Sequence, residues 1–155
     1  MPHETVFVTV HIHTDGPIPG PHSLLTLSSA AAHDGGDLIG TFTANVRELP
    51  GATLHPVSLE HWRTRAEDWL STRRASRPPA LATSAYLRWI ENLPGQPTLV
   101  TDPVGPDHLF LYWYLHRFTG HWPFARTSTE ADLRQRLPRP LCALSGCRTA
   151  LADTS

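Results

Sequence analysis

The sequence predicts a single α/β domain in which one mixed sheet is flanked by helices. Three observations favour this class: a period of two in the apolar residues near the N-terminus, helical spacing in the middle, and a short apolar strand between two helices. The chain has 155 residues, which suits one ordinary domain. No linker or internal repeat divides it, so residues 1–155 are expected to form one domain.

Three strands are predicted in the first third of the chain, and they cover residues 5–13, 24–32 and 38–46. In the first of them β-branched residues alternate with other types, so His11 and His13 project from the same face. The segment 14–21 (TDGPIPGP) is a stiff turn, because it holds two glycines and three prolines. The second and third strands form an antiparallel hairpin with a loop longer than two residues.

Helices and one further strand are predicted in the rest of the chain. The predicted helices are a short one capped by Ser58 with a second after it, one starting at 76–79, one from Gly105 to about Phe118, and a short one over 128–136. The apolar stripe of the first pair is Trp62, Ala66, Trp69 and Leu70. The helix that begins at Gly105 is apolar nearly all round, which indicates burial. Residues 98–101 are expected to be a buried strand.

Composition excludes several classes of protein. The longest apolar run, residues 109–115, is too short to cross a membrane, and the N-terminus shows no secretory leader. Cys142 and Cys147 cannot build a disulfide framework, so a cytoplasmic location is expected. Residues 61–155 carry 12 arginines against eight acids. This excess of positive charge would suit a phosphate-bearing partner; the alternative is that the arginines lie on an ordinary solvated surface.

Several segments together resemble a known family. The segment VHIHTDGPIPGPHSLLTL resembles the first motif of the DnaQ-like 3′–5′ exonucleases of the DEDDh group, an Asp-x-Glu strand followed by TDGPIPG. The likeness continues through LIGTFTANV, LEHW, AEDWL, RPPA…WIENLPG and DPVGPDHLFLYWYLHRFTG. It covers residues 5–125 and, more weakly, 126–155, and it implies an RNase H-like fold. The family continues into a further helix at its end, so the domain is expected to be truncated at the C-terminus.

The resemblance also assigns catalytic positions, and most of them hold a different residue here. His11 and His13 stand at the family's first aspartate and glutamate, Asp107 at its second aspartate, and Arg148 and Asp153 at its final histidine and aspartate. The family hydrolyses phosphodiesters with two divalent cations that four carboxylates hold. Arg148 stays protonated and cannot act as a general base. The ordinary two-magnesium site is therefore not expected.

The resemblance further implies residues that contact the substrate. Thr14, Asp15 and Gly16 match the loop that lies beside the scissile nucleotide in the family, and Trp62 lies in the helix that borders the cleft. Each has a structural alternative. The prolines alone explain a stiff turn, and the helical spacing of Trp62 suits a core residue.

Three interpretations of function remain open. The first is a degenerate exonuclease homologue, a pseudoenzyme that binds a single-stranded nucleic-acid end or a protein. The second is an active 3′–5′ exonuclease in which His11, His13, Asp107 and Asp153 hold one divalent transition metal such as Zn²⁺ or Mn²⁺. The third is a decayed copy without a biochemical role. No membrane partner is expected in any of them, and a homodimer is compatible with all three.

Overall fold

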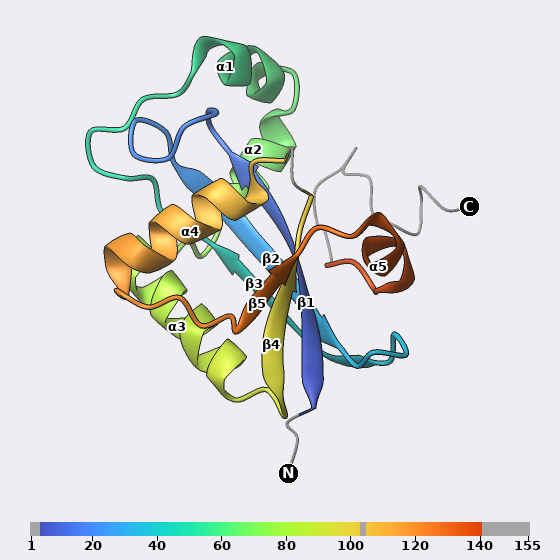
Figure 1. The fold of residues 1–155 in the computed structure, drawn as a ribbon. Coiled ribbons are helices and arrows are strands. Elements are labelled where there is room, and N and C mark those ends of the chain that lie inside the picture. The colour runs from blue at the N-terminus through green and yellow to red at the C-terminus, as the bar shows by residue number, and fades with distance from the viewer. Residues whose placement is uncertain (1–3, 103–104, 141–155) are drawn as a thin grey trace.

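One sheet of five strands organises the part of the chain that the computed structural model describes, residues 4–102 and 105–140, in the order β3-β2-β1-β4-β5. The strands are β1 (Thr5–Thr14), β2 (Leu24–Ala32), β3 (Leu38–Asn45), β4 (Gln96–Val100) and β5 (Arg126–Ser128). Helices surround this sheet, and the N-terminus lies at the end where β1 and β4 begin (Figure 1). The predicted mixed α/β class is confirmed.

The first three strands are antiparallel, and all three were predicted to within about a residue. β1 pairs with β2, so that His11 lies opposite Ser28 and His13 opposite Thr26, and β2 pairs with β3. Every residue of β2 is buried. This burial explains why β2 is rich in alanine and serine, because small side chains suit a central strand that is covered on both faces.

The last two strands are parallel to β1. β4 pairs with β1, and β5 pairs with β4. Parallel neighbours need a crossover connection, and α3 (Pro79–Glu91) and α4 (Asp107–Phe118) supply the two crossovers. β5 was not predicted, because it consists of three polar residues. The predicted helix over 128–136 is therefore wrong at its start: Ser128 ends β5, and α5 (Ala131–Arg136) begins after Glu130.

The two faces of the sheet carry different helices. The larger core joins the sheet to α3 and α4, and its fully buried members include Val6, Val8, Tyr86, Ile90, Phe110 and Tyr114. A smaller core joins the other face to α5 and the residues after it, through Leu133 and Leu137 with Phe7 packed against them. Side chains alternate along a strand, so His11 projects from the same face as Phe7. The strand thus directs His11 toward the face that carries α5.

The helix pair before α3 begins differently from the prediction. α1 (Pro56–Arg63) starts two residues before Ser58, and its N-cap is His55, whose Nδ1 accepts a hydrogen bond from the Val57 N–H at 3.2 Å. The predicted Ser58 cap is wrong. Proline in the first turn costs the helix no hydrogen bond, which allows this earlier start.

The predicted apolar stripe of α1 and α2 (Ala66–Arg73) is also wrong in part. Trp62 is buried, but Ala66 and Leu70 are exposed, whereas Asp68 and Thr72 are buried. The two helices are separate, so helical spacing counted across the break between them does not describe one face.

α4 is buried on one face rather than all round. Phe110, Leu111, Tyr114 and Leu115 form its buried face, whereas Leu109 is 51% exposed and Tyr112 47% exposed. The prediction of a wholly buried helix is wrong, because Tyr112 on the outer face contacts His108, His116 and Trp122 instead of the core of the sheet.

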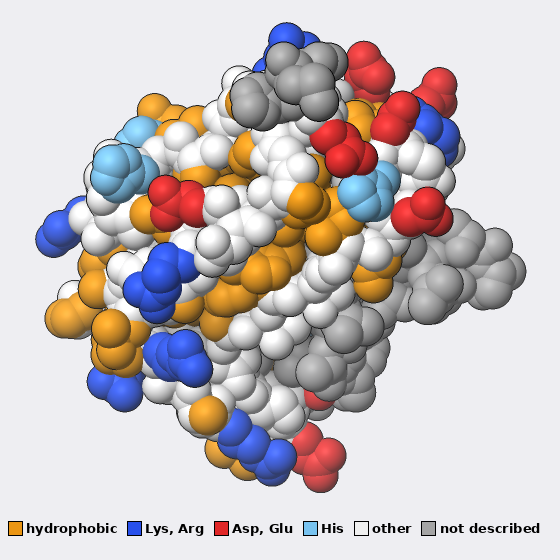
Figure 2. Space-filling view, turned by 90° about the horizontal axis from the view of Figure 1, so that it is seen from below, with side chains coloured by type: hydrophobic (Ala, Val, Ile, Leu, Met, Phe, Trp, Pro, Cys, Tyr) orange, Lys and Arg blue, Asp and Glu red, His pale blue; other side chains and the backbone are white. Residues whose placement is uncertain are grey.

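The end of the molecule at which β1 and β4 begin is shown in Figure 2. Acidic side chains gather mainly along one margin of this view and arginines mainly along others, with apolar side chains exposed between them. Within the described residues, no helix is long and apolar enough to cross a membrane.

Candidate functional site

A cleft of about 270 Å³ opens beside the carboxyl ends of β1 and β4. Its lining residues come from these strands, from the first residue of α4, and from α5 and the segment after it; they are Thr9, Val10, His11, Val100, Thr101, Asp102, Asp107, Arg134, Arg139 and Pro140. β1 and β4 are parallel neighbours, so their carboxyl ends meet at one edge, and α4 begins just beyond β4. Crevices at this position are common ligand sites in α/β proteins.

Two imidazoles from β1 lie next to each other at this edge. The ring centroids of His11 and His13 are 4.9 Å apart, and their planes are nearly perpendicular. Burial lowers the pKa of His11, and the nearby Arg139 lowers it further. Burial also lowers the pKa of His13 to about 4, with help from His11 and His61 and against the opposing effect of Asp68. His13 is therefore neutral near pH 7.

Asp107 is the carboxylate that α4 contributes to the cleft. Burial and, to a smaller extent, the nearby Asp102 raise its pKa to about 6. Asp102 in turn pairs with Arg134, with 3.5 Å between Oδ2 and Nη1. Below about pH 6 this carboxyl group is mostly neutral, and it then binds a hard dication less well than an ordinary aspartate does.

Arg134 and Arg139 are lining residues that the sequence did not reveal. Arg134 lies on α5, and its Nε is buried without a hydrogen-bond partner among the described residues. Arg139 follows α5 and is exposed. Their place in the cleft follows from β5, because β5 positions α5 over this edge of the sheet. β5 consists of three polar residues, and such a segment is not predicted to be a strand from its sequence.

The loop from Thr14 to Ser23 uses its polar groups internally. The Asp15 carboxylate, 3% exposed, accepts a hydrogen bond from the Ser23 N–H, and the Thr14 hydroxyl donates to the Gly16 carbonyl oxygen at 2.9 Å. The His22 ring lies against Gly16, and a Cβ on that glycine would overlap it. The contacts of Thr14, Asp15 and Gly16 thus help to maintain the shape of the loop, and their contact with a substrate stays a prediction.

Trp62 connects this loop to α1. It is 5% exposed, and its Nε1 donates to the Thr14 carbonyl oxygen at 3.4 Å. Its ring centroid lies 6.2 Å from that of His13 and 5.5 Å from that of Trp69. Trp62 therefore packs beside His13, and the cleft lining described above does not include it.

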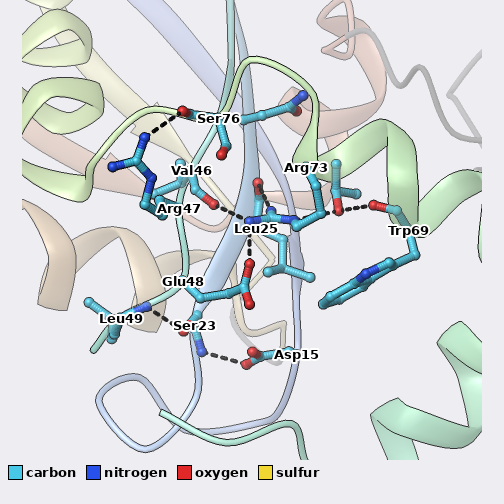
Figure 3. A network of polar contacts seen from close by, with 12 residues as sticks. Asp15, Ser23, Leu25, Val46, Arg47, Glu48, Leu49, Trp69, Arg73 and Ser76 are labelled. Carbon is cyan, nitrogen blue, oxygen red and sulfur yellow. Dashed lines mark hydrogen bonds and ion pairs between the residues drawn. The ribbon is translucent and has the colours of Figure 1, made fainter. Parts of the chain in front are cut away.

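Arg73 fixes α2 against the sheet. Its guanidinium donates to the carbonyl oxygens of Leu25 at 3.0 Å and Val46 at 2.8 Å, and it pairs with the Glu48 carboxylate at 2.8 Å (Figure 3). The guanidinium carbon also lies 5.5 Å from the centroid of the Trp69 ring. This network holds the helix pair that carries Trp62 in place.

The predicted catalytic residues are only partly brought together. His11 and Asp107 line the cleft, and His13 lies beside His11. Arg148 and Asp153 lie outside the described residues. Within residues 4–102 and 105–140, no three His, Cys, Asp or Glu side chains are grouped so that they could share a metal ion.

Comparisons with known proteins give a match in structure only. No protein-family model matches the chain, and no curated protein matches it. The solved structures that match include product-bound exonuclease I, with a TM-score of 0.64 and 8% identity over 85% of this chain and 31% of that chain. They also include the zinc-bound form of the Escherichia coli exonuclease I complex with single-stranded DNA, with a TM-score of 0.64 and 8% identity over 85% of this chain and 29% of that one.

The metal-free form of that complex matches equally well, with a TM-score of 0.65 and 9% identity over 85% of this chain and 29% of that one. The chain thus spans less than a third of the length of these structures. At this identity the likeness shows the fold, and it confirms the exonuclease-type RNase H-like fold that the sequence resemblance implied.

Proposed function

We propose that the chain binds the end of a single-stranded nucleic acid in the cleft and does not cleave it by the ordinary two-magnesium mechanism. The observation that carries this proposal is the balance of charge in the cleft. Among its described lining residues, the two aspartates, Asp102 and Asp107, are matched by the two arginines, Arg134 and Arg139.

This set of donors does not fit two magnesium ions. Magnesium requires hard oxygen ligands in nearly octahedral geometry, and a two-metal site clusters carboxylates around both ions. Here Asp102 is paired with Arg134, burial raises the pKa of Asp107, and β1 presents an imidazole from His11. A two-metal hydrolysis is therefore not part of the proposed function.

The same residues suit a phosphate and a sugar. Guanidinium groups present paired N–H donors that match phosphate oxygens, which gives Arg134 and Arg139 a role toward the backbone of a nucleic acid. The His11 imidazole adds a polar ring to the same lining, of a kind that can hydrogen-bond to sugar hydroxyls. The exonuclease I structures described above include complexes with single-stranded DNA, which supports this class of ligand.

A second candidate function rests on the histidine pair. The rings of His11 and His13 lie next to each other, and burial lowers the pKa of both, so that near neutral pH they are in the uncharged form that a metal ligand requires. Asp107 is not grouped with both histidines in the described structure, so a further ligand would have to come from outside the described residues, where the family-equivalent Asp153 lies. One Zn²⁺ or Mn²⁺ held there would supply an activated water for 3′–5′ exonuclease activity.

One experiment separates the two candidates. End-labelled single-stranded RNA and DNA are incubated with the chain in Mg²⁺, Mn²⁺, Zn²⁺ or chelator, and both degradation and retention are measured. The proposed function predicts retention in chelator that weakens with salt, and no degradation in any metal. Degradation that requires Mn²⁺ or Zn²⁺ and disappears in His11→Ala and His13→Ala would establish the second candidate instead.

A third result bears on the decayed-copy interpretation. Thermal unfolding is followed on the same preparation, because a decayed copy is expected to unfold over a broad range. A sharp transition together with retention of oligonucleotide supports the proposed function. A broad transition without retention contradicts it.

A further inference from the structure

Four rings form a continuous cluster on the outer face of α4. His108, Tyr112 and His116 follow one another at intervals of four residues, so they lie along one side of the helix. Trp122, from the segment after α4, completes this set, which is called the outer ring cluster below. Ring centroids are 5.9 Å apart for His108 and Tyr112, 4.2 Å for Tyr112 and His116, and 5.3 Å for Tyr112 and Trp122.

The rings on the outer face of α4 are more exposed than the rings on its inner face. Phe110 and Tyr114 are fully buried, whereas Tyr112 is 47% exposed and His116 is exposed. The rings of His116 and Trp122 are nearly parallel, with 9° between their planes. The inner rings build the core, and Trp122 is partly buried against it, whereas Tyr112 and His116 present aromatic surface to the solvent.

The charged residues of the segment that carries the outer ring cluster have one sign. Residues 108–128 include Arg117 and Arg126 and contain no aspartate or glutamate. By contrast, the helix pair α1 and α2 carries Glu60, Glu67 and Asp68. The segment thus combines exposed aromatic rings with arginines and lacks acidic residues. Such a combination is complementary to an anionic ligand that has flat rings.

The outer ring cluster begins where the cleft ends. Asp107 lines the cleft, and His108 is the next residue of the same helix. The nine residues from His108 to His116 are separated by eight steps along the helix, which span about 12 Å of its axis. Stacked nucleotides rise about 3.4 Å each, so this length accommodates about three bases.

We propose that the outer ring cluster is a stacking surface for the bases that adjoin a nucleic-acid end held in the cleft. This inference rests on the proposed function and extends it from one terminal nucleotide to the neighbouring ones. Bases stack on aromatic side chains whatever their sequence, and arginines nearby attract the backbone. The ligand is therefore a single strand several nucleotides long, without a strict sequence requirement.

The test measures the affinity of the full chain for two end-labelled probes in chelator, a dinucleotide and a single strand of about eight nucleotides. The variants are Tyr112→Ala, which removes an exposed ring, and Tyr112→Phe, which keeps it. Leu81→Ala is the matched control, because Leu81 is 60% exposed on the neighbouring helix α3 and lies outside the cluster. Melting temperature is recorded for each variant.

The proposal predicts that Tyr112→Ala weakens binding of the longer probe at least about fivefold and leaves the dinucleotide unchanged. Tyr112→Phe and Leu81→Ala are expected to bind the longer probe as the unmodified chain does. A longer probe whose backbone lacks bases is expected to bind more weakly and to be insensitive to Tyr112→Ala.

Three results would overturn it. If the longer probe binds Tyr112→Ala as well as the unmodified chain, the stacking surface is wrong and the cleft proposal stands. If neither probe binds the unmodified chain, both proposals are wrong. If Tyr112→Ala leaves nucleic-acid binding unchanged and alters only the particle mass measured by light scattering, the cluster is a surface through which copies of the chain associate.

Discussion

The loop from Thr14 to Ser23 and the cleft beside α5 lie near the same end of β1, yet they use their polar groups in opposite ways. In the loop, the Asp15 carboxylate accepts a hydrogen bond from the Ser23 N–H, and His22 accepts one from the Ile18 N–H at 3.3 Å. The polar groups of this loop therefore maintain its own shape.

In the cleft, by contrast, burial shifts the pKa of polar groups or leaves them without a hydrogen bond. Burial raises the pKa of Asp107 to about 6 and lowers the pKa of His11, and Arg134 Nε has no hydrogen-bond partner among the described residues. Groups displaced in this way are commonly found at functional sites. The described contacts of the loop are thus internal, and the proposed binding site lies in the cleft beside it. Substitutions in the loop should change stability, and substitutions in the cleft should change binding.

Gly16→Ala is expected to have the largest effect on stability. An added Cβ would overlap the His22 ring, which is 9% exposed and has little room to move. Overpacking of this kind costs about 2–3 kcal/mol of unfolding free energy. Urea denaturation followed by circular dichroism measures this loss.

Gly35→Ala is the matched control for that substitution. No atom lies within 4 Å of the position that a Cβ on Gly35 would take, so the change should stay within about 0.5 kcal/mol. Equal stabilities of the two variants would show that the loop is not tightly packed and would remove the contrast between loop and cleft.

Asp107→Asn is expected to stabilise the fold by a smaller amount, and only above acidic pH. The pKa of Asp107 is raised from 3.8 to about 6, so in this window the unfolded chain releases the proton while the folded chain keeps it. The stability of the unmodified chain therefore falls as pH rises through the window, and asparagine removes this loss. After allowance for solvent screening, the gain near pH 7 is about 1–2 kcal/mol.

Urea denaturation near pH 3.5 and pH 7 checks this expectation. Below pH 3.8 the carboxyl is mostly neutral in both states, so the stabilities of Asp107→Asn and the unmodified chain should approach each other. A stability difference that is the same at both pH values would contradict the buried, displaced carboxyl on which the cleft argument depends.

The sequence predicted most of the sheet because its signals were local. The alternation in residues 5–13 and the apolar runs that became β2 and β3 identify strands without knowledge of the rest of the fold. β5 was missed because pairing with β4 defines it, and its own residues are polar. The outer face of α4 was predicted to be buried because Leu109 and Tyr112 are apolar or aromatic, and sequence alone does not tell whether such side chains face the core.

The candidate site was predicted less completely. Adjacent positions on one strand face placed His11 and His13 together, and the family resemblance identified Asp107. Arg134 and Arg139 reach the cleft through α5, more than 120 residues after His11, so no local pattern could assign them. The roles of Thr14, Asp15 and Gly16 depend on hydrogen bonds and contacts within the folded loop, which the motif alone does not reveal.

The most direct test of the account is the affinity of Arg139→Gln for a single-stranded oligonucleotide in chelator. Arg139 lines the cleft and is exposed, so its replacement should leave the melting temperature unchanged. The account predicts that the variant binds about tenfold more weakly and that the salt dependence falls by about one phosphate contact. Unchanged affinity and unchanged salt dependence in a fully folded variant would contradict a nucleic-acid end bound in this cleft.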